Sequence, residues 1–378
     1  MQIGKKKFLI CLTAAFLAGG AITWAVSAAL SQGAGITENK YSKLEEIYEH
    51  IDSIYYEDAD PDELMDGACR GLVSGLGDEY SSYMTAEEYK GWVTNLQGEY
   101  SGIGITFTQD RNGDYVVVSV TKDSPAEAAG IEQGDILLMA DGKTYDDMDM
   151  FADAIRGEED TKLKITYMRD DSESTVEITR KNIVQQSVEY KMLDSDTALI
   201  NITSFIDNTG EDFSKALAKA EEDGAKNLVL DLRDNGGGLL TSCLAVADEF
   251  LDKGPVVYVE DKQKNREAYE AEDGKTNLNT VVLVNENSAS AAEILAAALQ
   301  DNGFTVAGQT TFGKGVIQST VKLEDGSALK LTVMQYFSPE GKAIHKKGVT
   351  PDVKVENREN SDTDAQLDKA LELLKQQD

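Results

Sequence analysis

Between about residues 184 and 355 the sequence alternates short strand-like segments with amphipathic helices. Asn227–Leu232 has the pattern of a strand buried on both faces, and Leu239–Leu251 follows it with helical spacing. Thr280–Val284 and Ser290–Gln300 repeat the same order. This alternation is typical of βαβ units. It predicts a mainly parallel sheet with helices packed on its faces.

Four other segments differ from this one in composition and pattern. Residues 1–30 are largely apolar, and residues 31–96 join a Gly/Ser/Ala-rich connector to segments with helical spacing. Short strands and turns occupy residues 97–181, and residues 356–378 form a polar linker and an amphipathic helix. We therefore expect a multidomain protein of mixed α+β and α/β class, with 182–355 as the α/β core.

The N-terminus has the pattern of a membrane segment. Lys5-Lys6-Lys7 precedes an uncharged apolar run from Phe8 to Leu30, long enough to cross a bilayer. The basic residues before it predict a cytoplasmic N-terminus and an extracytoplasmic remainder. We expect a single-pass anchor in the cell membrane. Ala25–Ala29 also resembles a signal-peptidase site, so a secreted form remains an alternative.

Charge and cysteine content exclude several classes of function. The net charge is −32, from 68 acidic and 36 basic residues, which argues against nucleic acid as a partner of the folded part. No cluster of Cys and His has metal-ligand spacing, so we expect neither a metal nor a cofactor. Cys11 lies in the apolar run, and whether Cys69 and Cys243 pair stays open.

Ser290 begins a predicted helix directly after a strand and has small neighbours. A substrate carbonyl can approach such a serine, and the N–H of Ala291 can point toward the same place. Ser288 is the rival nucleophile two residues earlier. Either serine can instead act as a simple helix cap.

Lys314 lies between two glycines, in Thr311-Phe312-Gly313-Lys314-Gly315, and Gln318 follows four residues later. The chain has only two histidines, so a histidine base for a serine nucleophile is hard to supply. A buried, neutral lysine can take that role, and Gln318 can hold its amine by a hydrogen bond. The alternative is a solvated loop lysine.

A glycine-rich turn, Gly236–Gly238, joins the buried strand Asn227–Leu232 to the next helix. Three consecutive glycines let the backbone approach another group closely. Free N–H groups at such a turn can stabilise an oxyanion, and we expect Gly237 and Ala291 to supply them. The spacing of a phosphate-binding loop is absent.

Taken together, these motifs resemble the C-terminal processing peptidases, also called tail-specific proteases. The serine motif Ser288–Glu293, the lysine motif Thr311–Gly315 and the stretch Asp231–Gly238 occur in the family's order. The resemblance implies a crotonase/ClpP-like core with Ser290 as nucleophile, Lys314 as base and Gln318 as its partner. Gly236 stands where the family usually has proline, and Ala292 where serine is common.

The resemblance further implies that residues 97–181 are a PDZ domain. Its carboxylate-binding loop is expected at Gly102, Ile103, Gly104 and Ile105, where backbone N–H groups can take a peptide C-terminus. Family properties also suggest that this domain gates the protease site and that helical segments can form a homodimer.

The resulting hypothesis is a membrane-anchored serine endopeptidase that cleaves proteins at or near accessible C-termini. Ser290 attacks, Lys314 moves the proton, and the PDZ domain controls access. A catalytically silent PDZ scaffold is the main alternative, against which the intact Ser290, Lys314 and Gln318 argue. An acyl-CoA enzyme is a third possibility, which the export signal disfavours.

Overall fold

The computed structural model describes residues 38–110, 113–272, 274, 276–357 and 363–376. It divides into two compact units. One holds the residues up to Tyr89 together with Gln318–Thr332, and the other holds Lys90–Ile317 and Val333–Asp378. Each unit has its own internal organisation.

The first unit combines helices with part of a hairpin. Its elements are α2 (Glu38–Ile54), α3 (Pro61–Ser74), β1 (Ser82–Met84), the start of α4 (Ala86–Gln97), most of β16 (Val316–Lys322) and the first half of β17 (Ala328–Phe337). Asp60 caps α3 by accepting the N–H groups of Asp62 and Glu63, and Pro61 is the first residue of the helix, where proline is well tolerated. β1 pairs antiparallel with β17, with Tyr83 opposite Leu329.

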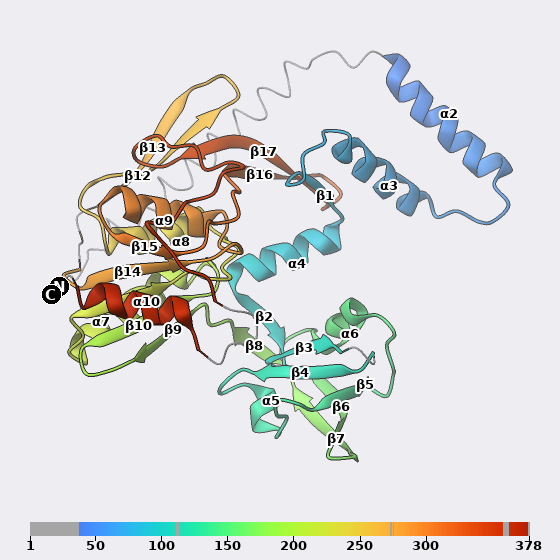
Figure 1. Ribbon diagram of the computed structural model, residues 1–378. Helices are drawn as coiled ribbons and strands as arrows, with labels where there is room; N and C mark the ends of the chain where they lie inside the picture. The colour runs from blue at the N-terminus through green and yellow to red at the C-terminus, as the bar shows by residue number, and fades with distance from the viewer. Residues whose placement is uncertain (1–37, 111–112, 273, 275, 358–362, 377–378) are drawn as a thin grey trace, which may run out of the picture. The chain divides into compact units, whose positions relative to one another are not determined.

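The PDZ-like region in the second unit is an antiparallel sheet whose strands follow chain order. It contains β3 (Ile105–Gln109), β4 (Tyr115–Val120), β5 (Ile136–Ala140), β6 (Lys162–Arg169) and β7 (Ser172–Thr179), with helices α5 (Pro125–Ala128) and α6 (Met148–Ile155). Phe151, Leu163 and Ile165 are buried in its core. β3 forms one edge of the sheet (Figure 1). The paired strands β2 (Glu99–Gly102) and β8 (Lys181–Val184) lie at the two ends of this region in the sequence.

The core of the second unit is the mainly parallel sheet that the sequence predicts (Figure 1). Its order is β18-β15-β14-β11-β10-β9, and only β9 is antiparallel. The strands are β9 (Val188–Met192), β10 (Thr197–Ile202), β11 (Asn227–Asp231), β14 (Asn279–Val284), β15 (Thr305–Gly308) and β18 (Val353–Lys354).

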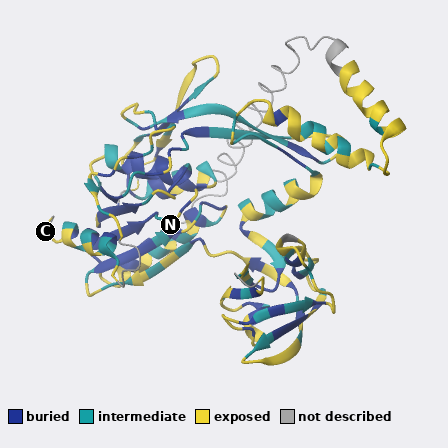
Figure 2. Cartoon of the chain, turned by 45° about the vertical axis from the view of Figure 1, so that its right-hand side comes forward, coloured by how far each residue is buried: buried dark blue, intermediate teal, exposed yellow. Residues whose placement is uncertain are grey.

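Both faces of this sheet are covered by helices. Leu228 and Leu230 of β11 pack in the larger core with α7 (Thr209–Glu222), α8 (Leu240–Asp248) and α9 (Ala291–Asp301). Val229, between them, packs in a smaller core with the C-terminal helix α10 (Ala365–Leu374). Alternate residues of a strand face opposite sides, so a strand covered on both faces reads as one apolar run. Figure 2 shows the buried strands.

A second sheet lies beside this core. β12 (Gly254–Asp261) pairs antiparallel with β13 (Arg266–Ala271) and with the second half of β17, where Tyr258 is opposite Phe337. Arg266 lies over the rings of Tyr258 and Phe337. β17 therefore brings its buried end, including Tyr336, to the core of the second unit.

The candidate membrane segment Phe8–Leu30 lies outside the described residues. Within the described part of the chain, no helix has both the length and the apolar character needed to cross a membrane. Cys69 and Cys243 are both free thiols, so the pairing left open by the sequence does not form.

Candidate functional site

Ser290 lies at the turn between β14 and α9, where it is the N-cap residue of the helix. Its backbone has φ 56° and ψ −115°, a conformation that non-glycine residues rarely adopt. Ser290 is half-buried, and its N–H donates to Oε2 of Glu293 at 2.9 Å. Strained backbone of this kind is concentrated at functional sites.

The hydroxyl of the rival serine, Ser288, is hydrogen-bonded in the protein interior. It is fully buried, and its hydroxyl donates to the carbonyl of Leu232 at 2.8 Å. The same oxygen accepts the N–H of Asn285 at 2.9 Å. Ser288 therefore holds the turn together, and Ser290 is the serine that remains accessible to a substrate.

The lysine loop is bound to the serine turn through its backbone. The N–H of Phe312 donates to the carbonyl of Ser288 at 3.0 Å, while the Phe312 ring is exposed. The N–H of Lys314 donates to Oε2 of Glu293 at 2.8 Å. Lys314 is half-buried, as Ser290 is. The structure thus brings the backbone of Lys314 close to the turn that carries Ser290.

Glu293 connects these two segments, and the analysis of the sequence did not single it out. Its carboxylate is buried and accepts four hydrogen bonds. Oε2 takes the N–H groups of Ser290 and Lys314, and Oε1 takes the hydroxyl of Thr311 at 2.5 Å and the N–H of Gly313 at 2.7 Å. Burial raises the pKa of this carboxyl, and the four donors oppose that shift. A capping-box spacing, serine with glutamate three residues later, is the sequence signal that points to it.

Tyr336 is a second residue that sequence reasoning missed. It is fully buried, and its hydroxyl lies 3.1 Å from the carbonyl oxygen of Ser290. The same hydroxyl contacts the carbonyl oxygen of Lys314. No local pattern predicts this contact, because β17 lies far from both residues in the sequence.

The glycine turn packs directly against Ser290. A Cβ atom on Gly237, whose φ is 98°, would lie 2.7 Å from Cβ of Ser290 and 2.9 Å from the nitrogen of Ala291. The turn therefore approaches the serine closely. The N–H of Gly237, however, donates to Oδ1 of Asn235 at 2.8 Å. The structure therefore differs from the expectation that Gly237 presents its N–H to a substrate.

Gly238, the next residue, is better placed to be a donor. The carbonyl of Gly237 accepts the N–H of Phe205, and the N–H of Leu239 donates to the carbonyl of Phe205. Gly238 lies between them, so its own N–H points away from Phe205. Gly238 is exposed, and its N–H has no hydrogen-bond partner among the residues that the structure describes.

Gln318 belongs to the first unit, where its Nε2 donates to Oγ1 of Thr332 at 3.3 Å. Ser290 and Lys314 belong to the second unit. The pairing of Gln318 with Lys314 therefore stays a prediction.

The predicted carboxylate-binding loop, Gly102–Ile105, has its carbonyl groups occupied. The carbonyl of Ile103 accepts the N–H of Ala126, and that of Gly104 accepts the N–H of Thr121. Within the described ranges, the N–H groups of Ile103 and Gly104 have no partner. Gly104 has φ 82°, and a Cβ there would lie 2.4 Å from Cβ of Ser124. The loop leads into the edge strand β3, which fits strand addition by a peptide.

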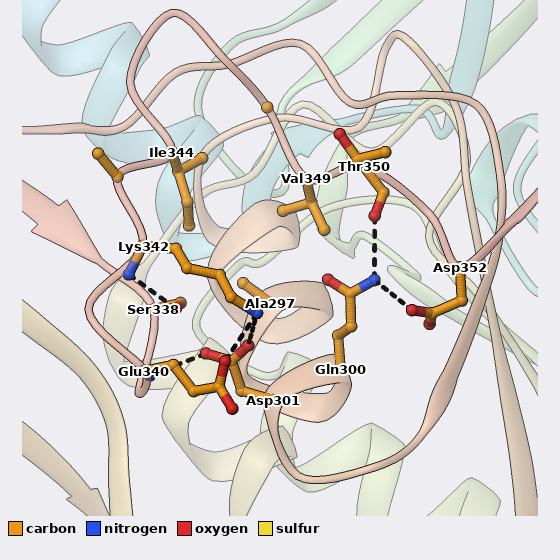
Figure 3. A pocket seen from close by; sticks show the side chains of 12 residues that line it. Ala297, Gln300, Asp301, Ser338, Glu340, Lys342, Ile344, Val349, Thr350 and Asp352 are labelled. Atoms are coloured by element: carbon orange, nitrogen blue, oxygen red, sulfur yellow. Dashed lines mark hydrogen bonds and ion pairs between the residues drawn. The ribbon is translucent and has the colours of Figure 1, made fainter.

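A polar pocket of about 430 Å³ lies at the other end of α9 (Figure 3). Asp301 lines it, and its buried carboxylate pairs with Lys342 at 2.7 Å and accepts the N–H of Glu340. These bonds give Asp301 a structural role. Burial works to raise the pKa of this carboxyl, but Lys342 and its other donors hold it below the usual range.

Three family descriptions match this chain. Residues 196–355 match peptidase family S41, residues 101–179 match a PDZ domain, and residues 20–88 match the N-terminal domain of the activating protease CtpB.

Individual relatives match over most of the chain. The carboxy-terminal processing protease CtpA of Bacillus subtilis (strain 168) is 38% identical over 360 residues, which are 93% of this chain and 77% of that protein. A probable CtpA-like serine protease of Staphylococcus aureus (strain COL) is 38% identical over 84% of this chain and 65% of its own length. The solved photosystem II D1 C-terminal processing protease is 30% identical, with a TM-score of 0.51 and coverage of 84% and 86% of the two chains.

Proposed function

Because the chain belongs to the carboxy-terminal processing peptidase family and is a serine-type peptidase, we propose that Ser290 is its nucleophile and Lys314 its general base. One observation carries this proposal. The N–H groups of Ser290 and Lys314 donate to the same oxygen atom, Oε2 of Glu293. The two residues are therefore neighbours in space although they lie 24 positions apart in the sequence.

In the proposed reaction, Oγ of Ser290 attacks the scissile carbonyl while Nζ of Lys314 accepts the hydroxyl proton. Lys314 must be neutral to act as a base, and it then gives the proton to the leaving amine. Water hydrolyses the acyl-enzyme on Ser290 in the second half of the reaction. We assign to Gln318 the role of orienting Lys314, as the family resemblance implies.

The tetrahedral oxyanion needs preorganised donors, and the turn geometry favours Gly238 with Ala291. Ala291 is the first residue of α9, where N–H groups have no acceptor within the helix. Gly238 offers an exposed N–H that faces away from Phe205. Gly237 contributes by lacking a Cβ, which lets the turn approach Ser290. Removing one oxyanion donor typically costs about 10²–10³ in kcat.

We assign substrate recognition to the PDZ domain. The N–H groups of Ile103 and Gly104, which bond to none of the described residues, can bind a terminal carboxylate, while the substrate chain pairs with β3. The substrates are then proteins with accessible C-termini, and occupancy of the domain controls access to the protease site.

The proposal also covers where the protein is located and how it assembles. The apolar run Phe8–Leu30 would anchor the protein in the cell membrane, with the catalytic part outside the cytoplasm. Exposed apolar side chains on α2 and α3, including Ile54 and Leu72, would support a homodimer. Membrane fractionation with protease protection tests the first point, and light scattering at several protein concentrations tests the second.

Cleavage of casein by purified variants tests the catalytic assignment. Ser290→Ala and Lys314→Ala should each lose about 10³-fold or more in activity. Ser288→Ala should remain active and should still label with a fluorophosphonate probe. Activity in either of the first two variants would refute the assignment, and a wild-type protein that never labels would favour the silent scaffold. Comparing protein C-termini in cells with and without Ser290 would then identify the substrates.

A further inference from the structure

We propose that Glu293 and Tyr336 are positioning residues. They hold the turn at Ser290 and the loop at Lys314 in a fixed position relative to each other. Both act through the backbone of Ser290 and Lys314 and need not touch the substrate. This inference rests on the proposed Ser/Lys mechanism and adds to it the groups that place the two side chains.

Glu293 fixes the N–H side of both residues. Its Oε2 receives the N–H groups of Ser290 and Lys314, so a shift of either segment lengthens a bond to a shared atom. Its Oε1 receives the Thr311 hydroxyl and the Gly313 N–H from the same loop. Hydrogen bonds to an ionised acceptor are roughly twice as strong as neutral ones. The loop is therefore held at three residues by one buried side chain.

The donors require a carboxylate rather than an amide. Thr311 Oγ1 already accepts the N–H of Val349 at 2.7 Å, so its own proton is directed to Glu293. The other three donors are backbone N–H groups, which cannot accept. A glutamine in this place would turn its NH₂ toward at least one N–H donor and leave that donor unpaired in the interior.

Tyr336 fixes the carbonyl side of the same two residues. Its hydroxyl lies against the carbonyl oxygens of both Ser290 and Lys314. The N–H of Tyr336 donates to the carbonyl of Gly315 at 3.0 Å, which ties β17 to the residue after the lysine. Ser290 and Lys314 are thus held at their N–H groups by Glu293 and at their carbonyl groups by Tyr336.

Holding Ser290 and Lys314 in fixed relative positions affects the rate of the chemical step. Proton transfer from serine to lysine needs heavy atoms within hydrogen-bond reach, and a displacement near 1 Å can reduce the rate about 100-fold. Neither Glu293 nor Tyr336 is exposed to a substrate, because both are fully buried. Loss of either residue should therefore lower kcat and leave KM nearly unchanged.

The experiment measures kcat and KM on a quenched fluorescent peptide with a free C-terminus, using the full chain. Glu293→Gln removes the paired acceptor with little change in volume, and Tyr336→Phe removes only the hydroxyl. Thr280→Val is the matched control, because Thr280 is also buried and donates its hydroxyl to the carbonyl of Leu278, away from the site. Thermal unfolding of every variant is recorded in parallel.

We expect kcat to fall about 100-fold in Glu293→Gln and about 10-fold in Tyr336→Phe, with KM changed less than about twofold. Thr280→Val should lose a similar amount of thermal stability to Tyr336→Phe and keep kcat within about twofold. The double variant should lose less than the product of the single losses, because both residues hold the same register.

Several results would overturn the inference. They are a normal kcat in Tyr336→Phe, a matching loss of kcat in Thr280→Val, or single losses that multiply in the double variant. Tyr336→Phe keeps the test decisive if Glu293→Gln does not fold. Ser290→Ala and Lys314→Ala are measured alongside: if they remain active, the Ser/Lys mechanism itself fails. If they are inactive while Glu293→Gln and Tyr336→Phe behave as wild type, only the positioning role fails.

Discussion

The serine–lysine site and the PDZ loop use backbone groups in opposite ways. At the site, N–H groups of Ser290, Gly313 and Lys314 are all bound to Glu293. At the PDZ loop, the carbonyl groups of Ile103 and Gly104 are bound, while their N–H groups have no partner in the described part of the chain. Catalysis requires side chains in fixed places, so the backbone N–H groups of the residues that carry them are bound to Glu293. Recognition by strand addition requires donors that remain available.

Both regions nevertheless depend on a glycine that another residue approaches closely. A Cβ on Gly237 would meet Ser290, and a Cβ on Gly104 would meet Ser124. Each glycine also has a positive φ. Both regions therefore need a glycine where another residue approaches closely. The two regions differ in what the surrounding N–H groups bind.

The largest effect is expected from Gly237→Ala. The new methyl group would lie 2.7 Å from Cβ of Ser290 and 2.8 Å from the carbonyl oxygen of Ala289, so the turn must move away from the serine. We expect kcat/KM for a peptide substrate to fall at least about 100-fold.

Gly236→Ala is the control, because nothing lies within 4 Å of a Cβ at that position. Its activity should stay within about threefold of wild type. Equal losses in the two variants would mean that general loosening of the turn, and not its approach to Ser290, limits the reaction.

A smaller effect is expected from Gly104→Ala in the PDZ loop. The added Cβ would lie 2.4 Å from Cβ of Ser124, and alanine is also strained at φ 82°. Affinity for a peptide with a free C-terminus, measured by fluorescence anisotropy with the Ser290→Ala protein, should fall about 10-fold.

Gly130→Ala separates the effect of the contact with Ser124 from the effect of backbone strain at positive φ. Gly130 has a similar φ of 80°, with nothing within 4 Å of its Cβ position. It should lower domain stability and leave peptide affinity within about twofold. Equal losses of affinity in both variants would show that the Gly102–Ile105 loop does not form the binding site.

The sequence predicts the parts of this molecule that local patterns encode. The buried strand Asn227–Leu232 and the helix after it have clear periodicity, and the alternation to residue 355 indicates the parallel sheet. The capping-box spacing from Ser290 to Glu293 is also local. Its partners on the lysine loop are not, because they lie 18 to 21 residues away from Glu293.

What local patterns miss are contacts that only the tertiary fold creates. Tyr336 is one of two aromatic residues in β17, and no spacing marks it as the one beside Ser290. The pairing of β12 with β17 joins segments more than 70 residues apart. The Asn235 side chain bonds the Gly237 N–H over two residues, an Asx turn that a search for oxyanion donors does not weigh.

A pH-dependent effect of smaller size is expected from Asp135 in the PDZ domain. Its buried side chain pairs with Arg169 at 2.6 Å. Burial acts to raise the pKa of this carboxyl, but the Arg169 guanidinium holds it below the usual range. The folded-state pKa is thus lower than the unfolded one. The pair stabilises the domain above the unfolded pKa, near 4, and this contribution is lost as pH falls through the folded pKa.

Asp135→Asn should therefore speed hydrogen exchange of β5 and β6 amides about fivefold at pH 7. At the lowest pH at which the domain stays folded, the difference between variant and wild type should narrow, because Asp135 then also becomes neutral. Exchange in β11 of the protease core serves as the internal control and should not change. A difference that stays constant from pH 7 to pH 3 would contradict a role for the ionised carboxylate.

The smallest effect is expected from Gly236→Pro, which tests whether the catalytic turn is rigid. Gly236 stands where proline is usual in the family, its φ is not positive, and its Cβ position is open. Its N–H makes no hydrogen bond to any residue within the described ranges, so Gly236→Pro removes no bond there. The substitution should raise the free energy of unfolding by about 0.5–1 kcal/mol, because the unfolded chain loses freedom. If the catalytic turn works as a rigid element, kcat should stay unchanged or rise slightly while thermal unfolding shifts upward. A loss of kcat with raised stability would mean that this turn has to move during the reaction. The catalytic site and the PDZ loop would then differ only in whether their N–H groups are hydrogen-bonded, and not in rigidity.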